Sequence, residues 1–253
     1  MSAPAFIAVI PARYQSTRLP GKPLLDIGGV PMVLHVVARA RASQARAVYV
    51  ATDDERIRDV CEAAGVSVVM TDPRHASGTD RIAEVARHLQ LATDAIVVNV
   101  QGDEPLLPPS VIDQVAHNLA ARPAAGLCTL YADIWDEAEF LNPNAVKLVT
   151  DQQGQVLYFS RAPIPWPRDG HHAGTAWGKR HIGLYAYRVE VLQSFVRWPV
   201  AALEDREKLE QLRAMSHGVQ IHAERCCTAI PAGVDTAEDL ERVRQQWPGR
   251  NHT

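Results

Sequence analysis

Three cations lie within ten residues near the N-terminus, in a stretch that can form neither a continuous helix nor a strand. Arg13, Arg18 and Lys22 belong to the segment 11–23, which reads Pro-Ala-Arg-Tyr-Gln-Ser-Thr-Arg-Leu-Pro-Gly-Lys-Pro. Its prolines fix backbone angles and remove N–H donors. Because open parallel sheets bind ligands at the carboxyl ends of their strands, a stiff cationic loop after a buried strand predicts a polyphosphate cradle. The alternative is a solvated loop whose cations face water.

The familiar phosphate motifs do not match this loop. A P-loop reads Gly-x4-Gly-Lys-Ser/Thr, but Ser16 and Pro23 stand where its first glycine and its hydroxyl should be. The fingerprint Gly-x-Gly-x-x-Gly does not follow the strand either, which argues against a nicotinamide oxidoreductase. The loop therefore indicates a phosphate site of another kind.

Two carboxylates are candidates for a metal site beside the loop. Asp103 follows the apolar run 95–100 and would lie at the same edge of a parallel sheet as the cations. Mg²⁺ takes one or two carboxylates together with phosphate oxygens and water. Glu104 precedes Pro105 and can point elsewhere, and an ordinary acidic turn is the alternative. Asp235 precedes the last expected helix, where capping is the favoured role on pattern alone.

Two other polar stretches could bind ligands. The segment 75–81 opens an expected helix, so it could bind an anion or simply carry a cap at Ser77 or Thr79. Arg161, at the end of an expected strand, could hold a carboxylate with its guanidinium fork. Further polar groups downstream could read sugar hydroxyls, but a solvated helix face is expected for Glu207 and Glu210. These groups are Arg180, His181, Tyr185, Glu204, Glu207, Glu210 and Gln211.

Apolar periodicity predicts one α/β domain spanning residues 1–253. Strands at 6–10, 47–52, 66–70 and 95–100 alternate with three helices, a pattern typical of βαβ units on a parallel sheet. The first helix is expected at 32–43 and the third at 79–88, and the second follows Asp53 and Asp54, which can cap it, and ends at Gly65. Later strands are expected at 126–134, 146–150, 155–159, 183–188 and 220–224. An amphipathic helix is expected at 204–217, with Leu203, Leu209, Leu212 and Met215 inward, and a last helix at 236–247. A smaller region of about 126–225 is expected to be inserted.

Composition narrows the class of protein. With 47% apolar residues the chain can bury a sizeable core, and its net charge of −3 gives no general attraction to nucleic acid. No apolar run approaches the length of a membrane span, and the N-terminus does not read as a signal peptide. The four cysteines show no metal-binding spacing. We therefore expect a cytoplasmic protein in a reducing compartment.

Taken together, the motifs resemble those of the 3-deoxy-manno-octulosonate (KDO) cytidylyltransferases, over about residues 6–244. The matching stretches, in order, are 10–24, Ser77-Gly-Thr-Asp-Arg81, Val98-Asn-Val-Gln-Gly-Asp-Glu-Pro105, Asn142-Pro-Asn-Ala-Val-Lys147, Tyr158-Phe-Ser-Arg161, Ile164-Pro-Trp166 and Gly233-Val-Asp-Thr236. Arg-Leu-Pro-Gly-Lys is the most telling, because sialic acid cytidylyltransferases usually differ after the proline. The segment 168–179 departs from the family pattern, which leaves any lid or dimer contact there open.

The resemblance implies a three-layer, Rossmann-like nucleotidyltransferase fold with a mostly parallel sheet, in which the inserted region binds the sugar and dimerises. It implies a homodimeric, Mg²⁺-dependent enzyme that makes CMP-KDO from CTP and KDO for lipopolysaccharide biosynthesis and releases pyrophosphate. The implied catalytic residues are Arg13, Lys22, Asp103 and Asp235, the last two as metal ligands. The implied nucleotide-binding residues are Ala12, Arg13, Ser16, Arg18, Lys22, Ser77, Gly78, Arg81, Gln101 and Gly102. The implied sugar-acid residues are Arg161, His181, Tyr185, Glu204 and Gln211.

Two alternatives remain open on sequence. One is a cytidylyltransferase for another 2-keto sugar acid, such as a sialic acid or an amino analogue of KDO. The other is a non-catalytic nucleotide-sugar sensor, against which the presence of both Asp103 and Asp235 counts, because a sensor needs no metal carboxylates. The number of metal ions, any general base and the dimer interface are also open.

Overall fold

The computed structural model describes residues 4–15 and 19–247. Its central sheet has the strand order β11-β7-β10-β6-β1-β4-β5, and β8 and β9 branch from β10. The strands are β1 (Phe6–Pro11), β4 (Ala47–Thr52), β5 (Ser67–Met70), β6 (Ile96–Asn99), β7 (Leu127–Ile134), β8 (Lys147–Thr150), β9 (Val156–Ser160), β10 (Gly178–Arg188) and β11 (Ile221–Arg225).

The first half of the sheet is parallel, as the alternating pattern predicts. β1 pairs in parallel with β4 on one side and with β6 on the other, and β5 extends the sheet beyond β4. β1 is buried on both faces, because Ala8 and Ile10 pack into one core cluster and Val9 into the other. The carboxyl ends of β1 and β6 therefore lie side by side, which places the cationic loop next to Asp103.

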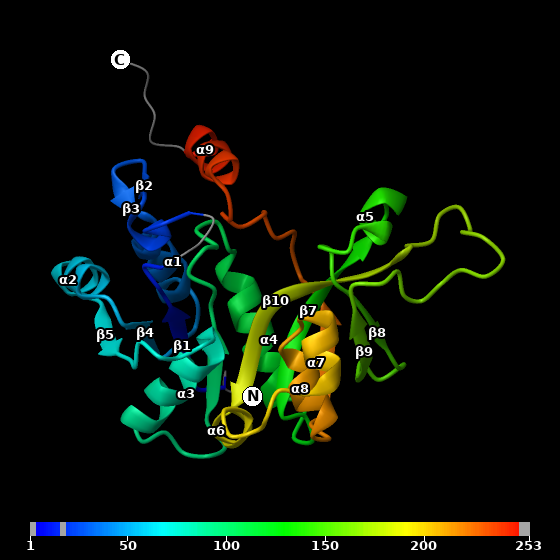
Figure 1. Cartoon of the computed structure of the whole chain (residues 1–253), viewed down its shortest axis with the longest axis horizontal. Coiled ribbons are helices and arrows are strands. Elements are labelled where there is room, and N and C mark those ends of the chain that lie inside the picture. Colours follow the sequence, from blue (N-terminus) through cyan, green and yellow to red (C-terminus); the bar gives the residue numbers. More distant parts are fainter. Residues whose placement is uncertain (1–3, 16–18, 248–253) are drawn as a thin grey trace.

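Helices cover both faces of the sheet, which confirms the three-layer fold (Figure 1). On one face pack α1 (Met32–Arg41), α2 (Glu55–Ala63) and α4 (Pro109–Ala120). On the other pack α3 (Gly78–His88), α6 (Val189–Phe195) and α8 (Gln211–Ser216). Among the helices of residues 4–15 and 19–247, none has the length and apolar character needed to cross a bilayer.

The second half of the sheet is mixed. β10 is antiparallel to both β6 and β7, and β11 is parallel to β7. β8 and β9 form a hairpin beside α5 (Glu137–Leu141) at one end of the molecule (Figure 1). The boundaries of an inserted region at about 126–225 stay a prediction, although β7, β10 and β11 are hydrogen-bonded into the central sheet.

Two of the expected elements differ in the structure. The single helix predicted at 204–217 is wrong: α7 (Ala202–Glu207) ends at Lys208, whose φ of 53° is left-handed, and α8 starts at Gln211. This break turns Leu209 into the core and leaves Leu203, predicted inward, 44% exposed. β10 begins five residues before the predicted start at Gly183, because Lys179 and Arg180 pair with β8.

The C-terminal helix α9 (Ala237–Gln246) packs against the start of the chain. The short strands β2 (Asp26–Ile27) and β3 (Val30–Pro31) form a hairpin after the cationic loop. A small core joins this hairpin to α9 and to the segment before it, and consists of Ile27, Met32, Val234, Leu240 and Val243. This packing brings Asp235, immediately after Val234, to the cationic loop.

Candidate active site

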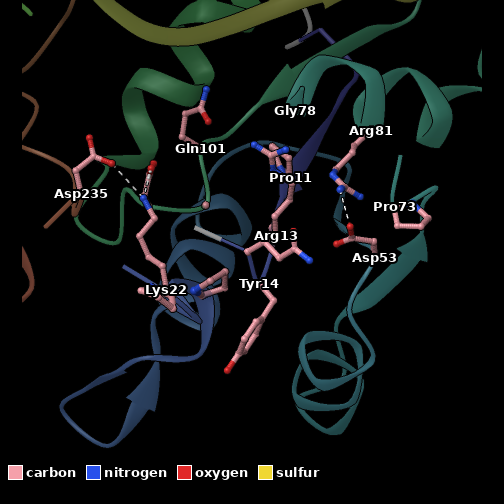
Figure 2. A pocket seen from close by; sticks show the side chains of 16 residues that line it. Pro11, Arg13, Tyr14, Lys22, Asp53, Pro73, Gly78, Arg81, Gln101 and Asp235 are labelled. Atoms are coloured by element: carbon pink, nitrogen blue, oxygen red, sulfur yellow. Dashed lines mark hydrogen bonds and ion pairs between the residues drawn. The ribbon is translucent and has the colours of Figure 1, made fainter. Parts of the chain in front are cut away.

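Lys22 joins two carboxylates that come from distant parts of the chain. Its Nζ donates to Oδ2 of Asp103 at 2.7 Å and to Oδ1 of Asp235 at 3.2 Å. It also donates to the carbonyl oxygen of Val234 at 3.0 Å. Figure 2 shows the lysine side chain extending toward Asp235. The structure thus brings together three of the four residues for which the resemblance implies a catalytic role.

Local backbone geometry positions this cluster. Gly21 adopts a left-handed φ of 68° and starts the 3-10 helix η1 (Lys22–Leu24), so that Lys22 is its first residue. The N–H of Gly21 donates to the carbonyl of Tyr14 at 3.0 Å and closes the loop. On the other side of the cluster, the N–H of Val234 donates to the carbonyl of Asp103 at 2.8 Å. The two carboxylate-bearing segments are therefore tied together through their backbones.

The cluster lies at one end of a cavity of about 770 Å³. Two glycines bring the cavity walls close to the end of β1: a Cβ at Gly102 would lie 2.7 Å from the carbonyl oxygen of Pro11, and one at Gly78 would lie 3.3 Å from its Cγ. Nine residues from the predicted site line the cavity, namely Ala12, Arg13, Lys22, Gly78, Arg81, Gln101, Gly102, Asp103 and Asp235.

A buried arginine forms the opposite end of the cavity (Figure 2). Arg81 of α3 donates to Oδ2 of Asp53 at 2.8 Å and to Oγ1 of Thr71 at 2.7 Å. Its Nε finds no hydrogen-bond partner in the part of the chain that the structure describes. Asp53 lies just after β4 and lines the cavity. The sequence suggested only a capping role for Asp53 and Asp54, and the cap of α2 is in fact Asp54.

The other predicted nucleotide residues are placed as follows. Arg13 is exposed and donates to the carbonyl of Ala76 at 3.2 Å. Ser77 caps α3: its hydroxyl accepts from the N–H of Asp80, whose carboxylate accepts from the N–H of Ser77. The hydroxyl is thus engaged in the cap, and its part in nucleotide binding stays a prediction. Ser16 and Arg18 lie outside the described residues.

Glu104 differs electrostatically from its neighbour Asp103. Burial raises the pKa of Glu104 to about 7, and the charge of Asp103 acts in the same direction. Its Oε2 has no hydrogen-bond partner among residues 4–15 and 19–247. Glu104 therefore carries only part of a negative charge at neutral pH, and Asp103 is the stronger candidate ligand for a cation.

A second polar group lies on β6 and β10, next to the cavity. Tyr185 pairs in register with Asn99. Within the described chain, the buried Tyr185 hydroxyl and Asn99 Oδ1 have no hydrogen-bond partners, and neither does the buried Nε2 of Gln211. Burial raises the pKa of Tyr185 well above its ordinary value. Gln101, two residues after Asn99, lines the cavity and donates to the carbonyl of Gly183 at 3.4 Å.

His181 belongs to the same surface of the sheet. Its ring lies 5.3 Å from that of Tyr185 and 5.1 Å from that of Phe159, measured between centroids. Its Nε2 is 3.1 Å from Oγ1 of Thr129. Burial lowers the pKa of His181 to about 3, so the imidazole is neutral at physiological pH.

Arg161 and Glu204 are engaged in contacts that hold the fold. Arg161 donates to the carbonyl of Glu207 at 2.7 Å and to that of Pro143 at 3.0 Å. Glu204 accepts two hydrogen bonds from Arg213, at 2.8 and 2.5 Å, and one from the N–H of Ala201. Their roles toward a sugar acid stay predictions.

The prediction that Glu207 and Glu210 form a solvated helix face is wrong. Glu207 accepts from the hydroxyl of Ser160 at 2.6 Å, and Glu210 accepts from the hydroxyl of Thr79 at 2.6 Å. Thr79 is also hydrogen-bonded to Tyr187, so this carboxylate shares a partner with the tyrosine pair. The charge of Glu210 contributes to the raised pKa of Tyr185 and of Tyr187. Glu210 is therefore a candidate site residue that helical periodicity alone could not reveal.

Comparisons with known proteins give a consistent result. A protein-family model described as Cytidylyltransferase matches residues 7–221. The chain is 56% identical to the 3-deoxy-manno-octulosonate cytidylyltransferase of Cellvibrio japonicus, covering 95% of this chain and 97% of that protein. It is 57% identical to the enzyme of the same name from Hahella chejuensis, covering 95% and 96%. It is 55% identical to the enzyme of the same name from Alcanivorax borkumensis, covering 97% of this chain and 100% of that protein.

Two solved structures extend the comparison. A structure of CMP:2-keto-3-deoxy-manno-octonic acid synthetase complexed with CTP superposes with a TM-score of 0.88 at 43% identity, covering 96% of this chain and 98% of that one. A cytidylyltransferase from Leptospira borgpetersenii gives a TM-score of 0.61 at 18% identity, covering 95% and 85%, which shows a shared fold. In each case the similarity covers at least 85% of both chains.

Proposed function

The chain belongs to the cytidylyltransferase family, and we propose that it transfers CMP from CTP to the anomeric hydroxyl of 3-deoxy-D-manno-octulosonate (KDO), with release of pyrophosphate. The observation that carries the proposal is the convergence of Lys22, Asp103 and Asp235 at one end of the cavity. Relatives at 55–57% identity that bear the name of this activity support the same assignment. The product, CMP-KDO, would serve lipopolysaccharide biosynthesis.

The two ends of the cavity suit the two ends of CTP. Lys22 and Arg13 would offset the negative charge that builds up on the pyrophosphate as it leaves. At the other end, the Arg81 guanidinium is held by Asp53 and Thr71, where it would contact the nucleoside. Phosphoryl transfer depends mainly on positioning and on charge stabilisation, which this arrangement provides without a covalent intermediate.

The carboxylates fit a divalent cation. Asp103 Oδ2 and Asp235 Oδ1 converge on one atom, Nζ of Lys22, within 3.2 Å. In the described part of the chain no three His, Cys, Asp or Glu side chains are grouped as a complete metal site. A pair of carboxylates suits Mg²⁺, which also takes oxygens from phosphates and water. When bound, Mg²⁺ would supply positive charge to the phosphates and lower the pKa of the attacking hydroxyl.

The second polar group would receive the sugar acid. Tyr185, Asn99 and Gln211 carry polar atoms that have no partner among the described residues, and a polyhydroxylated ligand could provide one. Glu210 adds an acceptor beside the tyrosines. Asn99 is the last residue of β6, and Gln101, two residues further on, lines the nucleotide cavity. The polar group around Tyr185 and Asn99 would therefore hold the KDO hydroxyl toward this cavity.

A homodimer is part of the proposal. Large apolar side chains are exposed in or next to α5, β8 and β9, at one end of the molecule in Figure 1: Trp135 (60% exposed), Leu141 (48%), Leu157 (57%) and Trp166 (67%). Exposed apolar surface of this kind is typical of a protein interface, and a second copy of the chain would cover it. Light scattering should give the mass of a dimer for the wild type and that of a monomer for Leu157→Glu with Trp166→Glu.

The proposal places the enzyme in the cytoplasm. All four cysteines are free thiols, as expected in a reducing compartment.

The proposed activity is tested by measuring pyrophosphate release with CTP and Mg²⁺ when KDO, its amino analogue or N-acetylneuraminate is added in separate reactions. Release with KDO is the expected result. Release only with another acid would overturn the sugar assignment, and CTP binding without any release would favour a sensor.

A further inference from the structure

Lys22 occupies the position in which the two proposed metal ligands meet. Resting on the function proposed above, we infer that Lys22 keeps a divalent metal out of this site until the phosphates of a nucleotide draw its ammonium away. The metal then enters together with the nucleotide and not before it. This gives Lys22 a second role, in the order of binding, besides that of stabilising the leaving group.

All three N–H donors of the Lys22 ammonium can be accounted for within the protein. An ammonium group has three donors and no acceptor. Lys22 Nζ has three acceptors, Asp103 Oδ2, Asp235 Oδ1 and the carbonyl of Val234, at 2.7, 3.2 and 3.0 Å. Its side chain is only 15% exposed. A phosphate can therefore gain a hydrogen bond from Lys22 only if the lysine gives up one of these partners.

The metal would need the same oxygen atoms. Mg²⁺ binds carboxylate oxygens at about 2.0–2.1 Å, so an ion on Asp103 Oδ2 would lie within about 5 Å of the present position of Nζ. Two cations at this separation repel each other strongly where solvent is partly excluded. Lysine and metal are thus competitors for Asp103 and Asp235, and one must leave for the other to bind.

A triphosphate resolves this competition. It offers new acceptors to Lys22 and supplies the additional oxygen ligands that Mg²⁺ prefers. The lysine side chain is long and unbranched, so its ammonium can move by rotation while η1 stays in place. Metal and nucleotide should therefore bind with positive coupling, each favouring the state in which Lys22 has left the carboxylates.

A purely structural role for the Lys22 bridge is the rival explanation. The two carboxylate segments, however, are joined independently of the lysine by the hydrogen bond from Val234 N–H to the Asp103 carbonyl, 2.8 Å long. Val234 also packs with Ile27 and Met32 in the core under α9. Removal of the lysine charge should leave this arrangement folded.

The test is Mn²⁺ binding to the full chain without nucleotide, measured by electron paramagnetic resonance. The variants are Lys22→Gln, Lys22→Met as a second neutral replacement, and Lys208→Gln as the control. Lys208 is an exposed lysine paired with Asp205, so the control removes the same charge elsewhere. We expect both Lys22 variants to bind Mn²⁺ at least tenfold more tightly than the wild type, and the control to bind as the wild type does.

A further substitution shows where the metal binds. Asp103→Asn added to Lys22→Gln should abolish the gain in affinity. The inference is overturned if the Lys22 variants bind Mn²⁺ no more tightly than the wild type, or if the gain survives Asp103→Asn. Pyrophosphate release by the wild type with CTP, KDO and Mg²⁺ is measured in parallel. Turnover without a gain in Mn²⁺ affinity would overturn this inference alone, whereas a gain without turnover would overturn the proposed function.

Discussion

The guanidinium of Arg81 donates to the carboxylate of Asp53 at 2.8 Å, at the end of the cavity opposite Lys22. Arg81 is 1% exposed and comes from α3, whereas Asp53 is 20% exposed and follows β4. Since a buried charge without its partner is strongly unfavourable, Asp53 fixes the position of the arginine. Asp53 is thereby a positioning residue for the part of the cavity that would receive the nucleoside.

Asp53→Asn should raise the KM for CTP about tenfold and change kcat less. A hydrogen bond to a charged group contributes about 1.5–3 kcal/mol, and about 1.4 kcal/mol corresponds to a factor of ten. Steady-state kinetics with varied CTP measure the effect. Asp54→Ala is the control, because it removes the cap of α2 and should lower stability by about 1 kcal/mol without changing this KM. An Asp53→Asn enzyme with the KM of the wild type would contradict the assignment.

Tyr185→Phe should raise the KM for KDO and leave the KM for CTP unchanged. The hydroxyl is buried and has no partner within the described residues, so its removal should also cost no stability. Kinetics with varied KDO and a thermal melt of each protein provide the two readouts. Tyr187→Phe is the control, because the Tyr187 hydroxyl is hydrogen-bonded to Thr79 and its loss should lower stability. An unchanged KM for KDO would remove Tyr185 from the sugar site.

Glu210→Gln and Glu204→Gln should separate two roles on either side of the helix break at Lys208. Glu210 lies beside Tyr185 and Tyr187, so its replacement should weaken KDO binding. Glu204 is held by Arg213 with only 8% of its surface exposed, so its replacement should lower the melting temperature and leave the KM for KDO near that of the wild type. The reverse pattern would restore the prediction from sequence that Glu204 meets the sugar acid.

Much of this arrangement follows from local patterns in the sequence. The apolar runs that became β1 and β6 predicted a buried parallel sheet, and this alone placed the cationic loop beside Asp103. The contacts of Asp53 with Arg81 and of Glu210 with Thr79 span 28 and 131 residues, so no local pattern could reveal them. The break at Lys208 was missed because an amphipathic period continues through it.

His181 should make the stability of the protein depend on pH. Burial lowers its pKa to about 3 in the folded state, below the value of about 6.5 in an unfolded chain. Between these two pH values His181 binds a proton in the unfolded chain but not in the folded protein, so protonation favours unfolding. The folded protein is therefore unaffected by this group above about pH 6.5 and loses stability as the pH falls below it. From pH 7 to pH 5 the loss should reach about 2 kcal/mol.

Urea unfolding of the wild type and of His181→Gln at both pH values measures this contribution. The variant should lose less stability than the wild type on going from pH 7 to pH 5, because glutamine takes up no proton. Equal losses in the two proteins would show that His181 is not held neutral by the fold.

The most direct test of the central claim is the rate of pyrophosphate release by Asp103→Ala with CTP, KDO and Mg²⁺. Removal of one preorganised charge-stabilising group costs about 10²-fold or more in kcat, and Asp103 is proposed to hold the cation on which this stabilisation depends. The account predicts a loss of at least this size in a protein that still melts cooperatively. A folded Asp103→Ala enzyme with nearly the wild-type rate would contradict it.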